Sequence, residues 1–270
     1  MKKIFQLKRV YLLFLMPLSF VLIFIAKNNS DFAEQVFSLH IYKWLSQIIS
    51  MVTSIFPFSL AEILILLLPF TFLFLFLYFI VKFVREKENR LNRLWKGILN
   101  LLCFLSVALF LFVILGGINY YRYPFRYYSN LEVRDSSVEE LYALTQSLAI
   151  DANELREMTN GEDEKGAFQL SLGMHELAEQ AAEAMAKLSE DYPVLGGNYG
   201  APKPVLLSSL MSHTEITGIF IPFTMEANVN VDIPDYSIPS TMLHELAHLR
   251  GFMREDEANF IAYLAGMKSE

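Results

Sequence analysis

The sequence predicts an α+β protein in two parts: three transmembrane helices, followed by a domain in which helices pack on a small sheet. Three observations support this prediction. Residues 10–26, 63–81 and 98–118 are apolar runs without a charged side chain, the two halves of the chain carry opposite net charge, and an alternating strand pattern precedes a short helix near the C-terminus. Of the 270 residues, 54% are hydrophobic and 19% are charged, which is too apolar for an ordinary soluble domain.

Each apolar run is long enough to cross a lipid bilayer as a helix, since about 20 residues span the hydrocarbon core. The first run follows a basic leader that includes Lys2 and Lys3, a pattern shared with cleaved signal peptides. The sequence after this run, AKNN, lacks a small-x-small cleavage pattern, so we expect an uncleaved anchor. The sequence therefore predicts a multi-pass membrane domain over residues 1–118.

The distribution of basic residues predicts the orientation. The N-terminal leader carries four Lys or Arg and residues 82–96 carry six, including Lys87, whereas residues 27–59 carry two. Because cytoplasmic segments collect positive charge, we expect the N-terminus and residues 82–96 in the cytoplasm and residues 119–270 outside it. Residues 40–55 are expected along the membrane interface or packed on the helix bundle. Six aromatic residues just beyond the third run are typical of an interface belt: Tyr120, Tyr121, Tyr123, Phe125, Tyr127 and Tyr128.

Charge and cysteine content exclude some classes of function. Residues 1–118 hold 12 Lys and Arg against 5 Asp and Glu, whereas residues 119–270 hold 10 against 24, so the two net charges are +7 and −14. A nucleic-acid surface needs clustered basic side chains, so the acidic half argues against a nucleic-acid partner. The single cysteine, Cys103, excludes an intramolecular disulfide and a Cys-based zinc site.

In the acidic half, Ser137 and Glu140 form a capping-box pattern that predicts a helix to about residue 158, with a break over 160–165. A second helix is expected over residues 167–188. Residues 216–223 read as a strand, and residues 227–233 alternate strictly, which is typical of a half-buried strand with Asn228 and Asn230 on its polar face. These two side chains would line a cleft or face water. A third helix is expected from about 240 to 250, and a last helix near Glu255.

The strongest local motif is an HExxH, His244-Glu-Leu-Ala-His248, on the third of these helices. Histidines four residues apart lie on one helix face, so both imidazoles can reach one zinc ion. The intervening Glu245 lies beside them and can take a proton from a water at the metal. The pattern therefore points to metal-assisted hydrolysis.

Zinc sites that catalyse use three protein ligands and keep one position open, so a third ligand is expected nearby. Gly251 lets the chain turn back toward the histidines, and two glutamates follow. Small residues continue the helix face that carries Glu255, so this face lets two helices approach each other closely. Glu255 is therefore the preferred ligand and Glu257 the alternative. Asn259, one turn beyond Glu255, is expected to orient one of the ligands.

The stretch His244-Glu-Leu-Ala-His-Leu-Arg-Gly-Phe-Met-Arg-Glu-Asp-Glu-Ala-Asn-Phe260, with the upstream residues 218–230, resembles the DUF3810 family of bacterial membrane proteins. More distantly it is similar to the gluzincin metallopeptidases. The resemblance implies an extracytoplasmic zincin-like domain over residues 119–270 of a protein of the bacterial cell membrane. It also implies Zn²⁺ held by His244, His248 and Glu255, with Glu245 as general base.

The leading interpretation is a membrane-anchored zinc-dependent peptidase that hydrolyses a peptide or protein substrate and whose other partner is the lipid bilayer. The alternative is a non-catalytic membrane sensor or binding module with a structural zinc. A transporter is disfavoured because the three apolar runs contain no charged residue and no histidine. His175 and His213 are expected to be structural, and Tyr236 and Tyr263 are among many tyrosines that could stabilise a reaction intermediate.

Overall fold

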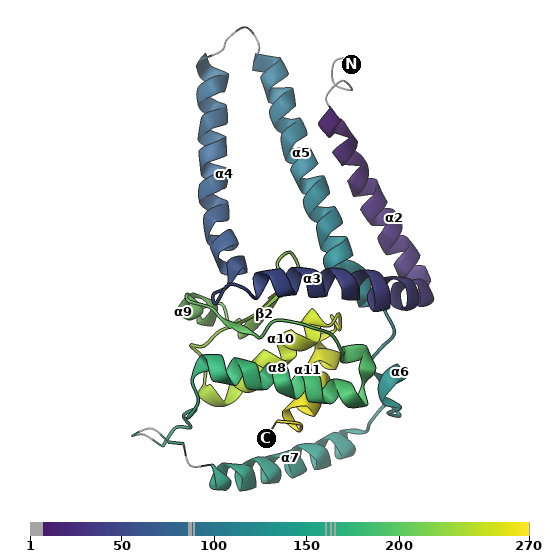
Figure 1. Ribbon diagram of the computed structural model, residues 1–270, viewed down its shortest axis with the longest axis vertical. Coiled ribbons are helices and arrows are strands. Elements are labelled where there is room, and N and C mark those ends of the chain that lie inside the picture. The colour runs from purple at the N-terminus through teal and green to yellow at the C-terminus, as the bar shows by residue number, and fades with distance from the viewer. Residues whose placement is uncertain are drawn as a thin grey trace.

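A computed structural model describes residues 8–85, 88, 90–159, 161–162, 164 and 166–269. Lys2, Lys3 and Lys87, which contribute to the predicted orientation, lie outside the described residues, as do residues 160 and 165 at the ends of the predicted helix break. The protein is mostly helical with a small three-stranded mixed sheet, and three long helices extend from one side of it (Figure 1).

The three long helices are apolar and long enough to cross a membrane, as predicted. The first candidate span is Lys8–Asn28, which begins as a 3-10 helix and continues as α2 (Leu15–Asn28); the others are α4 (Leu60–Arg85) and α5 (Arg90–Leu115). The third apolar run was expected to be helical to residue 118. Instead α5 ends at Leu115, and the next glycines lead into a 3-10 turn, η4 (Gly117–Tyr121). Glycine lowers the stability of a helix, which accounts for this earlier end.

The chain between the first two spans forms a π-helix, η2 (Phe32–Tyr42), and then α3 (Lys43–Thr53), which crosses beneath the long helices (Figure 1). The serines of α3 are buried against the rest of the protein: Ser50 Oγ accepts a hydrogen bond from the backbone N–H of Gly200 at 3.0 Å. The opposite face of α3 exposes large apolar side chains: Trp44, Ile48, Met51 and Val52. This is the pattern of a helix that lies in a membrane interface.

Two helices precede the sheet. The predicted capping box of α7 (Val138–Met158) is confirmed, because Ser137 Oγ accepts from Glu140 N and the Glu140 carboxylate accepts from Ser137 N. The predicted start of the next helix at residue 167 is wrong, since α8 runs over Met174–Asp191. Residues 167–173 instead form a bridge at Phe168 and bends, and Gly173 occupies the N-cap position.

The sheet has the strand order β1-β3-β2, with β1 (Lys203–Pro204) parallel and β2 (Gly218–Ile221) antiparallel to β3 (Glu226–Val229). The predicted half-buried strand over 227–233 is wrong in two respects: it ends at Val229, and its polar face is buried. Asn228 is 1% exposed because the start of α4 covers it, and its Oδ1 accepts a hydrogen bond from Ser59 Oγ at 2.5 Å. Asn230 is also buried and donates to Ile216 O. Neither side chain faces water, and Asn228 borders a small pocket beside the start of α4.

The remaining polar side chain of β3 also binds the start of the second candidate span. The carboxylate of Glu226 accepts hydrogen bonds from the backbone N–H groups of Leu60 and Ala61, at the N-terminus of α4, and pairs with Lys203. A carboxylate at this position satisfies N–H groups that have no partner within the helix. The sheet is therefore joined directly to the second candidate span.

Not every residue of the aromatic cluster after α5 fits the predicted interface belt. Phe125 is 2% exposed and packs edge-on against Tyr192, Phe252 and Phe260, so it belongs to the core of the domain. Tyr120 is exposed, as a belt residue would be. The prediction for Phe125 was wrong because the aromatic pattern does not distinguish lipid from protein neighbours.

Candidate metal centre

Two helices at the end of the chain build the centre. α10 (Ile238–Leu249) carries the HExxH motif, and its apolar face, with Met242 and Leu246, is fully buried. After α10 the backbone of Gly251 adopts φ 88°, which favours glycine, and its N–H donates to His248 O at 2.8 Å. α11 (Glu255–Gly266) then packs against α10, so Glu255 in its first turn lies next to the histidines.

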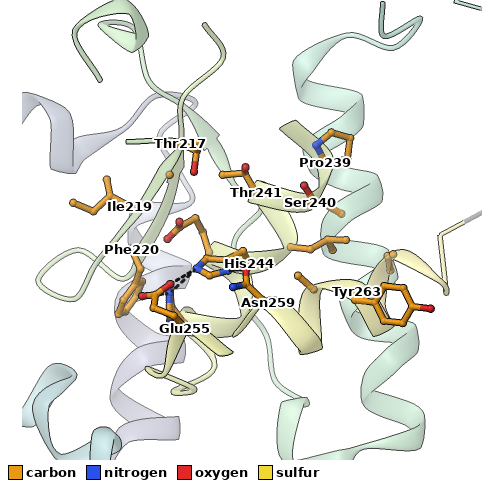
Figure 2. A pocket seen from close by; sticks show the side chains of 18 of the residues that line it. Thr217, Ile219, Phe220, Pro239, Ser240, Thr241, His244, Glu255, Asn259 and Tyr263 are labelled. Atoms are coloured by element: carbon orange, nitrogen blue, oxygen red, sulfur yellow. Dashed lines mark hydrogen bonds and ion pairs between the residues drawn. The ribbon is translucent and has the colours of Figure 1, made fainter. Parts of the chain in front are cut away.

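Three side chains converge there. The Nε2 atoms of His244 and His248 are 3.0 Å apart, and the carboxylate of Glu255 lies 3.1 Å from Nε2 of His244 and 3.6 Å from that of His248. Figure 2 shows Glu255 directed at His244. Tetrahedral zinc with bonds of about 2.05 Å separates its ligand atoms by roughly 3.3 Å. The spacing and the donor set are therefore those of a metal-binding group.

The outer nitrogens of both imidazoles have acceptor partners. Nδ1 of His244 lies 2.9 Å from Oδ1 of Asn259, and Nδ1 of His248 lies 2.7 Å from the backbone oxygen of Phe252. Because these oxygens accept hydrogen bonds, Nδ1 carries the proton in each ring, and the lone pair of Nε2 points into the group. This is the tautomer that binds a metal, and such partners fix the orientation of the ring. Asn259 thus lies where the sequence predicted an orienting residue.

Electrostatics at His248 also suit a metal ligand. Burial lowers the pKa of His248 below its ordinary value, outweighing the hydrogen bond to Phe252 O, which raises it. A ligating imidazole must be neutral, so a lowered pKa keeps the ring in its binding form.

Glu245 is a buried carboxyl at the edge of this group. It is only 4% exposed, and burial, followed by the nearby charge of Glu255, raises its pKa to about 8, while a hydrogen bond from the backbone of Phe220 lowers it. Oε2 of Glu245 has no hydrogen-bond partner among the described residues. Gly218 in β2 provides the space, since a Cβ there would stand 2.5 Å from Oε1 of Glu245.

The centre lines a cavity of about 1090 Å³. β2 contributes Ile219 and Phe220 to one wall, and Figure 2 shows these residues across from α10 and α11. Tyr236 and Tyr263 also line it. The sequence did not predict the contact of Gly218 with Glu245, although a glycine within a strand often marks the close approach of another group.

The other candidates lie elsewhere. Glu257, the alternative ligand, is turned away: its Oε1 accepts hydrogen bonds from the backbone N–H of Phe125 and from Arg254. His175 lies beside Glu179 on the surface of α8, and Nδ1 of exposed His213 is 2.6 Å from Ser209 O. Neither histidine is among the described residues that line the cavity.

Comparison with known proteins places the chain in a family. The family model described as "Protein of unknown function (DUF3810)" matches residues 37–270, a range that includes α3, two candidate spans, the sheet and the metal-binding group. No curated protein and no solved structure matches the chain. Since the match extends over most of the sequence, the chain belongs to the DUF3810 family.

Proposed function

We propose that the protein is a membrane-anchored zinc-dependent peptidase in which His244, His248 and Glu255 hold Zn²⁺ and Glu245 is the general base. The observation that carries this proposal is the position of Glu245, a buried carboxyl with an unpartnered oxygen beside three preoriented donor side chains. When bound, zinc supplies Lewis-acid chemistry that makes water nucleophilic and polarises a carbonyl. The positive charge of the bound metal would lower the pKa of Glu245, so its carboxylate would be ionised, and Oε2 would take the proton of the water and deliver it to the leaving amine.

The open edge of the sheet supports a peptide substrate. β2 is the edge strand next to β3, and its residues Gly218 and Phe220 line the cavity. Extended peptides commonly pair with such an edge. An active-site helix packed beneath an edge strand is the arrangement that a zincin-like, and more narrowly a gluzincin-like, domain requires. We therefore assign the peptide backbone to the cavity wall formed by Gly218 and Phe220.

The orientation belongs to the same proposal. The basic residues of segment 82–96 favour a cytoplasmic connection between α4 and α5, so α10 and α11 lie outside the cytoplasm of a bacterial cell. Substrates are then peptides or proteins at the outer side of the cell membrane.

The alternative function, a sensor or binding module with a structural zinc, is less well supported. Structural zinc sites are closed by four protein ligands, whereas the described residues supply three and the group opens onto a large cavity.

The experiment compares wild-type protein with Glu245→Gln, both reconstituted as the full chain and loaded with zinc, on a mixed peptide library. Removing the general base should lower the rate of hydrolysis at least about a hundredfold while zinc content stays the same. Asp256→Asn, which changes an exposed neighbouring carboxylate, is the matched control and should cleave like wild type. Equal cleavage by wild-type protein and Glu245→Gln, or none by either, would refute the proposal.

A further inference from the structure

The cavity extends from the metal-binding group to the end of a candidate span. Its lining includes Phe112 in the last turn of α5, Gly116 just after that helix and Tyr120 in η4, together with His244 and Glu245. A ligand in the cavity can therefore contact the metal-binding group and the end of α5 together.

β2 connects these two places. At its start, Gly218 lies against Glu245; just after its end, Pro222 packs on Gly116, where a Cβ would lie 3.6 Å from Cγ of Pro222. Four residues of strand cover about 13 Å. A peptide paired along the outer edge of β2 thus runs from the general base to the end of α5 within about four residues.

The apolar face of α3 marks the level of the membrane surface. Trp44, Ile48 and Met51 recur at helical spacing on its exposed side, and α3 crosses next to the ends of α4 and α5 (Figure 1). The other side is fixed to the domain, since the hydroxyl of Tyr42, directly before α3, donates to the backbone oxygen of Leu249 at 3.1 Å. Leu249 follows His248, so the metal-binding group is held close beneath this surface.

We propose that the substrate is a membrane-anchored polypeptide, cut in the extended segment immediately outside its membrane-spanning helix. This inference rests on the proposed peptidase function and adds the class of substrate. The segment pairs with the edge of β2, its membrane-proximal end lies at Gly116 and Tyr120, and the bond that is cut lies roughly four to eight residues from the span, given about 3.3 Å per residue.

The test uses the full chain in lipid vesicles with a defined probe: a randomised stretch of about 30 residues, extending to roughly 100 Å, between one transmembrane helix and a soluble reporter. The same stretch without the helix is the free probe, and Glu245→Gln protein gives the background. Mass spectrometry locates each cut. If the probe were cut only because it shares a membrane with the enzyme, the frequency of cuts would decline gradually with distance from the helix, about as the −3/2 power of linker length. Docking along β2 predicts a cluster roughly four to eight residues from the helix.

A second step separates distance from sequence. A flexible spacer of about ten residues is inserted between the helix and a sequence that was cut. The proposal predicts that cuts stay at the same distance from the membrane and appear in the spacer. Cuts that follow the original sequence, or equally fast cleavage of the free probe, would overturn this inference and leave the peptidase intact. If neither probe is cut above the Glu245→Gln background, the peptidase function fails and this inference fails with it.

Discussion

Glu245 on α10 and Gly218 on β2 lie so close that any side chain at position 218 must displace the carboxylate, since a Cβ would come within 2.5 Å of its Oε1. We predict that Gly218→Ala keeps zinc and lowers hydrolysis at least about tenfold, because a shift of about 1 Å at a reacting group costs up to a hundredfold. Steady-state kinetics and zinc content measure both effects. Gly173→Ala is the control, because nothing lies within 4 Å of its Cβ position. Wild-type activity in Gly218→Ala would contradict the assigned role of Glu245.

Asn259 accepts the hydrogen bond that orients His244. We predict that Asn259→Leu weakens zinc binding by about 10- to 100-fold, the usual cost of losing such a partner. Competition with a chelator of known affinity measures this change. The exposed Asn153 on α7 provides the control, Asn153→Leu, which should bind zinc like wild type. An unchanged affinity in Asn259→Leu would show that the contact does not support the metal.

An ion pair joins Glu34 of η2, in the segment after the first candidate span, to Arg122, beyond the third; their side chains are 0% and 4% exposed. Removing one partner leaves a buried charge unpaired, so Glu34→Ala should lower the free energy of unfolding by about 3–5 kcal/mol. The exposed pair of Arg134 and Glu140 is screened by water, so Arg134→Ala should leave stability almost unchanged. Chemical unfolding in detergent compares the two. Equal stability of both variants would contradict the structural role of the buried pair.

The proposed orientation predicts which cysteines react from outside. In a Cys103→Ser background, Ser147→Cys on α7 should react with an impermeant maleimide on intact cells, and Glu88→Cys between α4 and α5 should react only after permeabilisation. The reverse pattern would invert the topology.

The elements defined by local spacing were predicted from the sequence. The three spans need only an uncharged apolar run, and the convergence of His244, His248 and Glu255 follows from a four-residue helical repeat and a turn at Gly251. These features depend on residues close together in the chain.

Features that depend on distant segments were not predicted. The alternation predicted Asn228 on a polar face that lines a cleft or meets water, but Ser59, directly before α4, covers it. The sequence predicted Phe125 at the membrane interface, whereas in the fold its ring packs against Phe252. The alternation correctly shows that the strand has two different faces, and the aromatic cluster correctly shows an anchor. In both cases the fold decides which neighbour packs there.

The most direct measurement is the zinc content of the purified full chain and of three single variants. We predict about one zinc per wild-type chain, as three ligands and one open position imply. His244→Ala and Glu255→Ala should lose most of it, and Glu257→Ala should retain it, since Glu257 binds Phe125 and Arg254 instead. A wild-type chain without zinc, or a Glu255→Ala protein that keeps it while Glu257→Ala loses it, would contradict the assignment of the metal centre.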